Sequence, residues 1–111
     1  GLIDWNALEI QFRGKTSFVT RLASKALTNY QASSVRLHAI AAGEGELSEL
    51  SFVAHSIKGT AGTLKAAAVH ELATSTDQAA RDGAPASRQL AGQLAEQVDA
   101  MVRELEARIR E

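Results

Sequence analysis

The chain contains no cysteine, a single proline and only five aromatic residues of the Phe, Trp and Tyr types. The lack of cysteine excludes disulfides, thiolate catalysis and sulfur-ligated metal, and it fits a reducing compartment. Proline breaks helices and aromatic side chains favour strands, so their scarcity in an alanine-rich chain favours helices. We therefore expect an all-α protein.

Charge of one sign and long apolar runs are lacking as well. Twelve basic residues stand against 13 acidic ones, a net charge of −1, so the chain has no basic surface of the kind that nucleic-acid-binding proteins carry. No apolar run approaches the ~20 residues that span a membrane, and the start has no signal-peptide pattern. We expect no contact with nucleic acid or membrane and a cytoplasmic location.

The length of 111 residues suits one domain and is enough to bury a core without disulfides or metals. No internal repeat, low-complexity tract or long linker divides the chain. We therefore expect a single domain over residues 1–111. Gly1 stands where an initiating methionine would, so we expect a segment cut from a longer polypeptide.

Glycines and polar segments separate stretches in which apolar residues recur with helical spacing. Asp4 is expected to cap a short helix that ends near residue 12, before Gly14. A long helix should follow from residue 16 or 17 to the Gly43-Glu44-Gly45 segment, although its polar residues 29–34 could bend or break it. Its expected apolar residues are Phe18, Leu22, Ala26, Tyr30, Leu37 and Ile40.

The stretch from residue 47 to 64 has the clearest periodicity, with apolar residues at alternating steps of three and four. These residues are Leu47, Leu50, Ala54, Ile57, Ala61 and Leu64. A fourth helix is expected over residues 66–81, ending at Gly83. Its inward residues should be Val69, Leu72 and Ala79 or Ala80.

Pro85 suits the first turn of a last helix. The apolar stripe of that helix comprises Leu90, Leu94, Val98, Met101, Leu105 and Ile109. Long helices with short connections are typical of antiparallel neighbours. We predict an antiparallel up-down four-helix bundle with an N-terminal helical extension.

His55 lies on the 47–64 helix, roughly 130° around the helical wheel from the centre of the apolar stripe. It should therefore face solvent. Its neighbours on the wheel are Ser48, Ser51, Phe52, Gly59 and Gly62, with Lys58 on the flank. A glycine inside a helix costs about 1 kcal/mol relative to alanine. Two glycines on this face indicate that space is needed beside the imidazole.

The other side chains around His55 suit a reactive site. The ammonium of Lys58, three residues along, can neutralise an anion on the imidazole. Phe52 is an aromatic residue on the same outward face, which suggests a docking surface for another protein. The pattern describes an accessible nucleophile with a positive charge and an apolar rim.

An ordinary surface histidine is the alternative interpretation. Gly59 would then be the C-cap of the helix, and residues 60–63 would form a loop. Ala61 and Leu64 keep the apolar stripe in phase beyond Gly59, which favours a continuous helix.

The segment Ala54-His55-Ser56-Ile57-Lys58-Gly59-Thr60-Ala61-Gly62 resembles the signature of histidine-containing phosphotransfer (HPt) domains, alanine-His-x-Leu/Ile-Lys-Gly-x-Ala. The resemblance also includes residues 41–44, the turn before the histidine helix. It extends to residues 77–83, where the family often has Glu-x-Ala-Ala-Arg-x-Gly. It covers nearly the whole chain and is strongest between residues 41 and 83.

The resemblance implies a phosphocarrier with no ATP site and no enzymatic activity of its own. Such domains accept a phosphoryl group from an aspartate of one response-regulator receiver domain and pass it to another. Carried over by motif position, His55 is phosphorylated, Lys58 helps hold the phosphoryl oxygens and Gly59 gives the partner access. We expect Gly62 to share the access role. Receiver contacts are expected at Ser48, Ser51, Phe52 and Lys65.

The resemblance also implies which ions and partners to expect. We expect no cofactor bound by the chain, Mg²⁺ in the partner receiver, and a monomer. A metal site is not expected, because the three histidines lack His-x-x-x-His spacing and no cysteine is present. The domain is expected to be tethered to the C-terminal end of a hybrid sensor kinase, with a free-standing protein as the alternative.

Two residues depart from the family pattern. Lys65 stands where the family frequently has glycine, and it either is solvated, the favoured interpretation, or selects an acidic partner. Asp77 stands where the family often has glutamate or glutamine. Near His55 it could accept a hydrogen bond from the unphosphorylated ring nitrogen, but the sequence favours an ordinary exposed carboxylate. His38 and His70 are expected at the surface or its boundary, outside any site.

Two other functions remain open. One is a helical protein-interaction domain whose histidine is not phosphorylated. The other is the phosphoacceptor domain of a chemotaxis-type kinase, phosphorylated from ATP by a separate catalytic domain.

Overall fold

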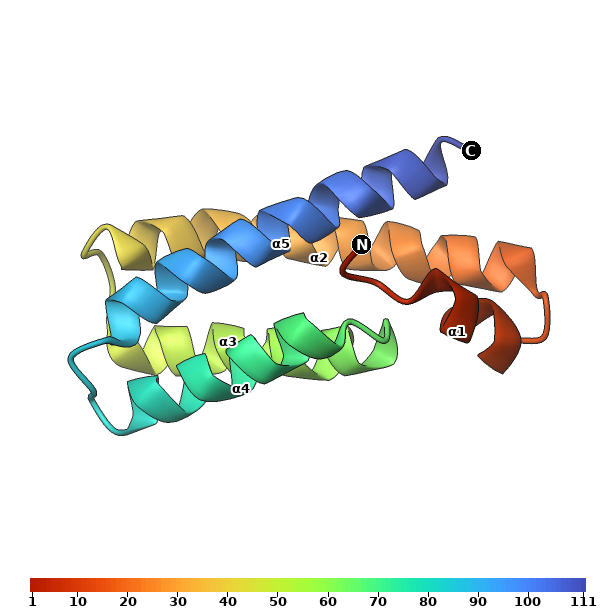
Figure 1. Ribbon diagram of the computed structural model, residues 1–111. Helices are drawn as coiled ribbons and strands as arrows, with labels where there is room; N and C mark the ends of the chain where they lie inside the picture. The colour runs from red at the N-terminus through yellow and green to blue at the C-terminus, as the bar shows by residue number, and fades with distance from the viewer.

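The computed structural model describes residues 1–111 and contains five α-helices and no strand. The helices are α1 (Trp5–Gln11), α2 (Thr16–Ala41), α3 (Leu47–Thr63), α4 (Ala67–Arg81) and α5 (Ser87–Ile109). Figure 1 shows α2 beside α5 and α3 beside α4, with α1 against the first turns of α2. The predicted four-helix bundle with an N-terminal helical extension is confirmed.

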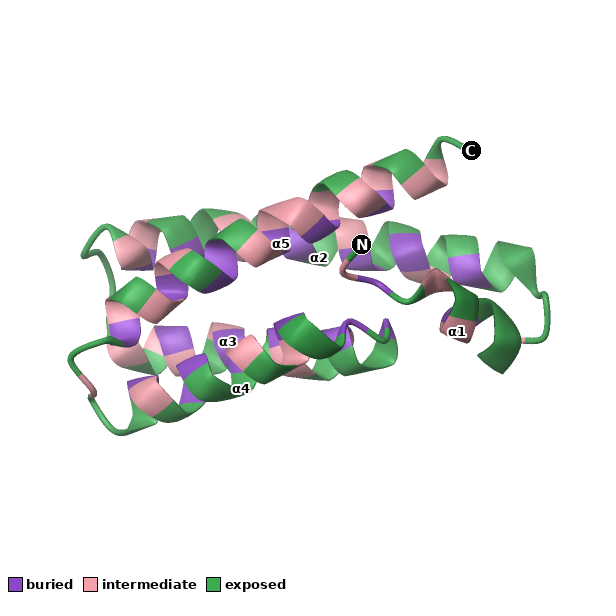
Figure 2. Cartoon of the chain, viewed as in Figure 1, coloured by how far each residue is buried: buried purple, intermediate pink, exposed green.

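The core of the bundle comes from one apolar stripe on each long helix, which appears as bands of buried residues in Figure 2. The stripe of α3 is the most complete. Five of its six predicted residues, from Leu50 to Leu64, are at most 1% exposed, and Leu47 packs at its edge. Because this side of α3 packs into the core, the opposite side of the helix faces solvent.

The helix α2 is continuous through residues 29–34, where a bend or break was possible. Two polar side chains in this segment, Tyr30 and Ser34, bond to neighbouring helices and therefore do not compete with the backbone of α2. The Tyr30 hydroxyl donates to Oγ1 of Thr60 on α3 at 2.7 Å, and Ser34 donates to Asp99 on α5. Burial raises the pKa of Tyr30 to about 12.

Two predicted positions differ from the structure. Phe18, expected in the apolar face of α2, is 40% exposed and packs against Phe12 with ring centroids 4.7 Å apart. Val19 is buried in its place, because this end of α2 faces α1 rather than the centre of the bundle. Pro85 lies in the turn before α5 and not in its first turn.

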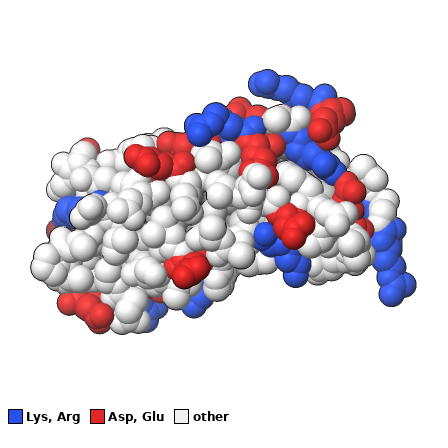
Figure 3. Space-filling view, in the orientation of Figure 1, with Lys and Arg blue, Asp and Glu red and all other residues white.

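The face of the molecule seen in Figure 3 carries side chains of both charges. Lys and Arg alternate with Asp and Glu over the face seen in Figure 3, and neither sign gathers into one large patch. None of the helices has the length and apolarity needed to cross a membrane.

Lys65 joins α3 to α4 in a left-handed conformation, with φ of 58°. Its carbonyl accepts a hydrogen bond from the backbone N–H of Asp4, which fastens the N-terminal segment to this turn. A residue with a Cβ atom is strained in this conformation, and glycine is not. This explains why glycine suits the position.

Replacing Lys65 by glycine is expected to raise the free energy of unfolding by about 0.5–1 kcal/mol, because the relief of strain exceeds the added entropy of the unfolded chain. Urea unfolding at neutral pH measures the change. Lys65→Ala is the matched control, because alanine retains the strain. An equal gain from alanine would contradict the backbone explanation and would show that the charge of Lys65 is destabilising.

Candidate functional site

His55 projects from the outward side of α3, and 67% of its side chain is exposed. The helix that carries it is held on its other side by Ala54 and Ile57, both buried. α3 runs on to Thr63, so Gly59 lies inside the helix and is not its C-cap. A Cβ atom built on Gly59 meets nothing within 4 Å. Open space therefore lies one turn beyond the imidazole.

Asp77 on α4 faces His55 across the contact between α3 and α4. Its Oδ1 accepts hydrogen bonds from Oγ of Ser51 at 2.6 Å and from Nε of Arg81 at 2.9 Å. Its Oδ2 lies 3.7 Å from Nδ1 of His55. Only 7% of Asp77 is exposed, so the expectation of an exposed carboxylate is wrong. The reason is that Asp77 lies on the side of α4 that packs against α3.

The carboxylate of Asp77 is held in its charged form. Burial raises its pKa, but the hydrogen bonds from Ser51 and Arg81 and the charge of Arg81 outweigh burial and place the pKa below its usual range. The distance of 3.7 Å to His55 is too long for a hydrogen bond, so the carboxylate acts on Nδ1 through its charge. The other ring nitrogen, Nε2, lies on the opposite edge of the imidazole and has no partner in the protein.

The lowered pKa of Asp77 predicts how stability depends on pH. A carboxyl group whose pKa is depressed by folding stabilises the protein above its unfolded pKa of about 3.9, and this contribution disappears as the pH falls through the folded value. We expect Asp77→Asn to lower the urea midpoint clearly at pH 7 and much less near pH 3. Glu71→Gln, an exposed change on the same helix, should give no such difference. A constant deficit at both pH values would contradict the assignment.

Lys58 lies three residues beyond His55, is half-buried and forms no ion pair with another residue of the chain. Its ammonium is free to approach an anion on the imidazole. Phe52, one turn before His55, is 77% exposed and is the most exposed large apolar residue of the chain. Ser48 is also exposed. Phe52 and Ser48 are thus exposed like His55, at three and seven residues before it on α3.

Three other predicted site residues lie elsewhere than expected. The hydroxyl of Ser51 turns inward to Asp77 and is not presented to a partner. A Cβ atom on Gly62 would lie 3.5 Å from Cδ2 of His70, so Gly62 lies where α3 approaches α4 rather than beside the imidazole. Lys65 is ten residues from His55, about 15 Å along a helix axis. The structure does not bring Lys65 to the histidine.

The two other histidines occupy different surroundings. His38 is exposed, and its Nε2 lies 2.8 Å from Oδ2 of Asp99, whose other oxygen accepts a hydrogen bond from Ser34. His70 is half-buried at the α3–α4 boundary. Both positions agree with a surface or boundary residue. No group of three potential ligands among His, Asp and Glu comes together to hold a metal ion.

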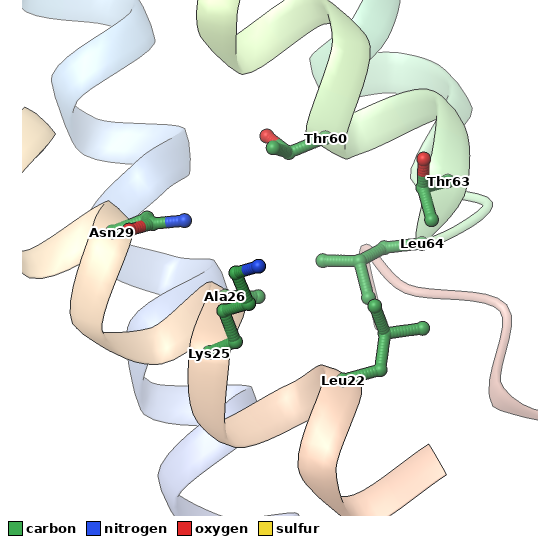
Figure 4. Close-up of a pocket in the computed structure, with 7 residues that line it drawn as sticks. All are labelled: Leu22, Lys25, Ala26, Asn29, Thr60, Thr63 and Leu64. Carbon is green, nitrogen blue, oxygen red and sulfur yellow. The ribbon is translucent and has the colours of Figure 1, made fainter. Parts of the chain in front are cut away.

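Sequence reasoning missed two features that involve α3 and its neighbouring helices. One is the Ser51–Asp77–Arg81 cluster. The other is a surface pocket of about 210 Å³ between α2 and α3 (Figure 4). It is lined by Leu22, Lys25, Ala26, Asn29, Thr60, Thr63 and Leu64. The pocket depends on how two helices pack, and no pattern within one helix indicates it.

Comparison with known proteins found one family match. The family model of the Hpt domain matches residues 22–108, from α2 to the last turns of α5. No curated protein and no solved structure shows a significant match to the chain. Hpt domains are helical phosphocarriers that interact with receiver domains in two-component signalling. The histidine motif on α3 lies within the match, and the chain therefore belongs to the Hpt domain family.

Proposed function

We propose that this chain accepts a phosphoryl group on His55 from an aspartyl phosphate of one receiver domain and passes it to an aspartate of another. The observation that carries the proposal is the setting of His55. Its imidazole is exposed on a well-packed helix, and its Nδ1 faces the buried carboxylate of Asp77 at 3.7 Å. No other histidine of the chain leaves Nε2 free in this way beside a lysine and an open glycine.

In the accepting step, the neutral imidazole carries its proton on Nδ1, and the lone pair on Nε2 attacks phosphorus. The bond between phosphorus and the aspartyl oxygen breaks, and its electrons leave on the carboxylate of the receiver. The phosphorylated ring then bears a positive charge, with its Nδ1–H directed at Asp77. Hydrogen bonds in active sites are often long before the partner binds, so we expect the 3.7 Å gap to shorten in the complex.

Phosphoryl transfer depends mainly on positioning and charge neutralisation, which the two proteins divide between them. On this chain, Asp77 balances the charge of the ring and Lys58 balances the phosphoryl oxygens. The chain binds no cofactor for the step, and the receiver supplies its own acidic pocket with Mg²⁺. Phe52, Ser48 and the open space at Gly59 form the area that the receiver approaches.

A phosphocarrier must not activate water against its own phosphohistidine. The nearest carboxylate, Asp77, has one oxygen occupied by Ser51 and Arg81 and the other directed at Nδ1, the ring nitrogen that is not phosphorylated. The hydroxyl of Ser51 is likewise committed to Asp77. No side chain near Nε2 is left as a general base. This supports a carrier rather than a hydrolase.

The test is phosphotransfer from a panel of phosphorylated receiver domains to wild type, His55→Gln and His38→Gln. His38 is the matched control because it is also exposed and also paired with an aspartate. We expect an acid-labile, alkali-stable label on wild type and on His38→Gln. His55→Gln should bind receivers without becoming labelled.

Other results would reject the proposal in distinct ways. Label that survives in His55→Gln would place the phosphoryl group on another residue. Label from ATP through a separate kinase domain, with none from any receiver, would support the phosphoacceptor of a chemotaxis-type kinase. Receiver binding without label on wild type would support an interaction domain.

A further inference from the structure

The two oxygens of the Asp77 carboxylate have different neighbours. Its Oδ1 receives both hydrogen bonds, from Ser51 at 2.6 Å and from Arg81 at 2.9 Å, while its Oδ2 is the oxygen nearest to His55. The two donors come from different helices. Ser51 lies four residues before His55 on α3, and Arg81 lies four residues after Asp77 on α4. The direction of the carboxylate is therefore set by both helices.

The chemistry of the donors makes this orientation specific. A guanidinium group donates hydrogen bonds and cannot accept them. The atom of Asp77 that faces Arg81 must therefore be an acceptor, which is Oδ1. With Oδ1 held in this way, the second carboxylate oxygen, Oδ2, is presented to His55. An acceptor beside Nδ1 favours the imidazole tautomer that has its proton there, as with histidines oriented by a carboxylate in other sites. Nε2 then carries the lone pair.

We propose that Ser51 and Arg81 are positioning residues for phosphoryl transfer, because together they hold Asp77 so that His55 keeps its proton on Nδ1 and its lone pair on Nε2. The inference rests on the proposed function of His55. It assigns to Ser51 and Arg81 a role that each exerts through its hydrogen bond to Asp77, without contact with the phosphoryl group.

The cluster around His38 provides a comparison within the same molecule. Like the His55 site, it combines a serine, a histidine and an aspartate. Ser34 lies four residues before His38, and Asp99 lies on the adjacent helix. There the carboxylate faces Nε2 instead of Nδ1, at 2.8 Å. A partner could reach only Nδ1 of that ring. The edge of the imidazole that faces the aspartate thus distinguishes the two histidines.

The first test needs no receiver. ¹⁵N NMR of the imidazole nitrogens reports which one carries the proton. We expect wild-type His55 to be mainly in the Nδ1–H form, and the double variant Ser51→Ala/Arg81→Gln to shift toward the Nε2–H form. The signals of His38 in the same spectrum should not move. Ser51→Thr with Arg81→Lys keeps a hydroxyl and a cation, and it should restore the wild-type tautomer.

The second test uses Asp77→Asn, whose amide oxygen should turn toward the two donors. Its NH₂ group then faces Nδ1 and favours the wrong tautomer, so we expect phosphorylation by phosphoramidate, a small donor, to slow on the order of tenfold or more. Adding Ser51→Ala/Arg81→Gln to wild type should slow phosphorylation as well. When the same pair is added to the Asp77→Asn variant, it should cause no further loss, because the amide is then free to turn over.

The combination separates this inference from the proposed function. An unchanged tautomer in a folded double variant, or an equal loss of rate in both backgrounds, would overturn the positioning roles. A tautomer shift on loss of Ser51 and Arg81 supports those roles even where no receiver phosphorylates His55, a result that would reject the proposed function alone. Circular dichroism confirms that each variant retains its helices.

Discussion

Replacing Gly59 by leucine is expected to abolish phosphoryl transfer from a receiver domain while leaving the protein at least as stable as wild type. Gly59 lies inside α3, and a Cβ atom there meets nothing within 4 Å. The change should therefore stabilise the helix by up to about 1 kcal/mol. The leucine side chain would fill the space one turn beyond His55, where the receiver brings its phosphoaspartate under the proposed function. Transfer assays and urea unfolding measure the two effects.

Two controls for Gly59→Leu distinguish steric blocking of the receiver from a loss of reactivity of the His55 imidazole. A small donor such as phosphoramidate should still phosphorylate His55 in this variant, because it needs less room than a protein. Gly59→Ala should retain most of the transfer, since it adds one methyl group. Full transfer from receivers to Gly59→Leu would show that the partner approaches from another side, and the access role of Gly59 would be wrong.

The fold could be predicted from the sequence because each long helix carries an apolar stripe in phase with the helical period. The stripe from Leu47 to Leu64 is the best example, since it also fixed the outward direction of His55 without knowledge of any neighbour. The structure confirms that direction. Which side of a helix faces solvent depends on the pattern of apolar residues in that helix, so it can be predicted from the sequence of the helix alone.

Contacts between helices could not be predicted in this way. Asp77 was expected on the surface, and its pairing with Ser51 depends on how far α4 is displaced along α3. A signal was nevertheless present. Asp77 is in phase with Val69 and Ala73, both buried, and Arg81 follows it by four residues as a partner for a carboxylate on an inward face. A charged residue in an apolar stripe with a cation one turn away indicates a buried pair.

The contacts of Arg88 are a second example of contacts between helices that the sequence does not predict, here between residues farther apart in the chain. Its guanidinium donates to the carbonyl oxygens of Ile40, Glu44 and Gly45, and it thereby ties the start of α5 to the connection between α2 and α3. These residues are more than 40 positions apart, and no periodicity links them. Only the assembled bundle shows that Arg88 holds the connection that precedes the histidine helix.

Ile57→Ala is expected to lower the free energy of unfolding by about 2–5 kcal/mol, the usual loss for truncating a buried isoleucine. Ile57 is 1% exposed and lies two residues from His55, on the opposite side of α3. A domain of this size is stable by about 5–15 kcal/mol, so the variant should remain folded with a clearly lower urea midpoint. Ser56→Ala, an exposed change at the next position, should stay within about 0.5 kcal/mol of wild type.

The rate of phosphotransfer should respond to Ile57→Ala far less than stability does, provided that the assay is run where the variant is folded. Ile57 contacts the core and not the phosphoryl group, so its loss leaves His55, Lys58 and Asp77 in their places. Gly59→Leu should show the reverse pattern, with transfer lost and stability retained. A large loss of transfer in folded Ile57→Ala would contradict this division, because it would mean that tight packing beneath α3 is itself needed to aim the imidazole at its partner.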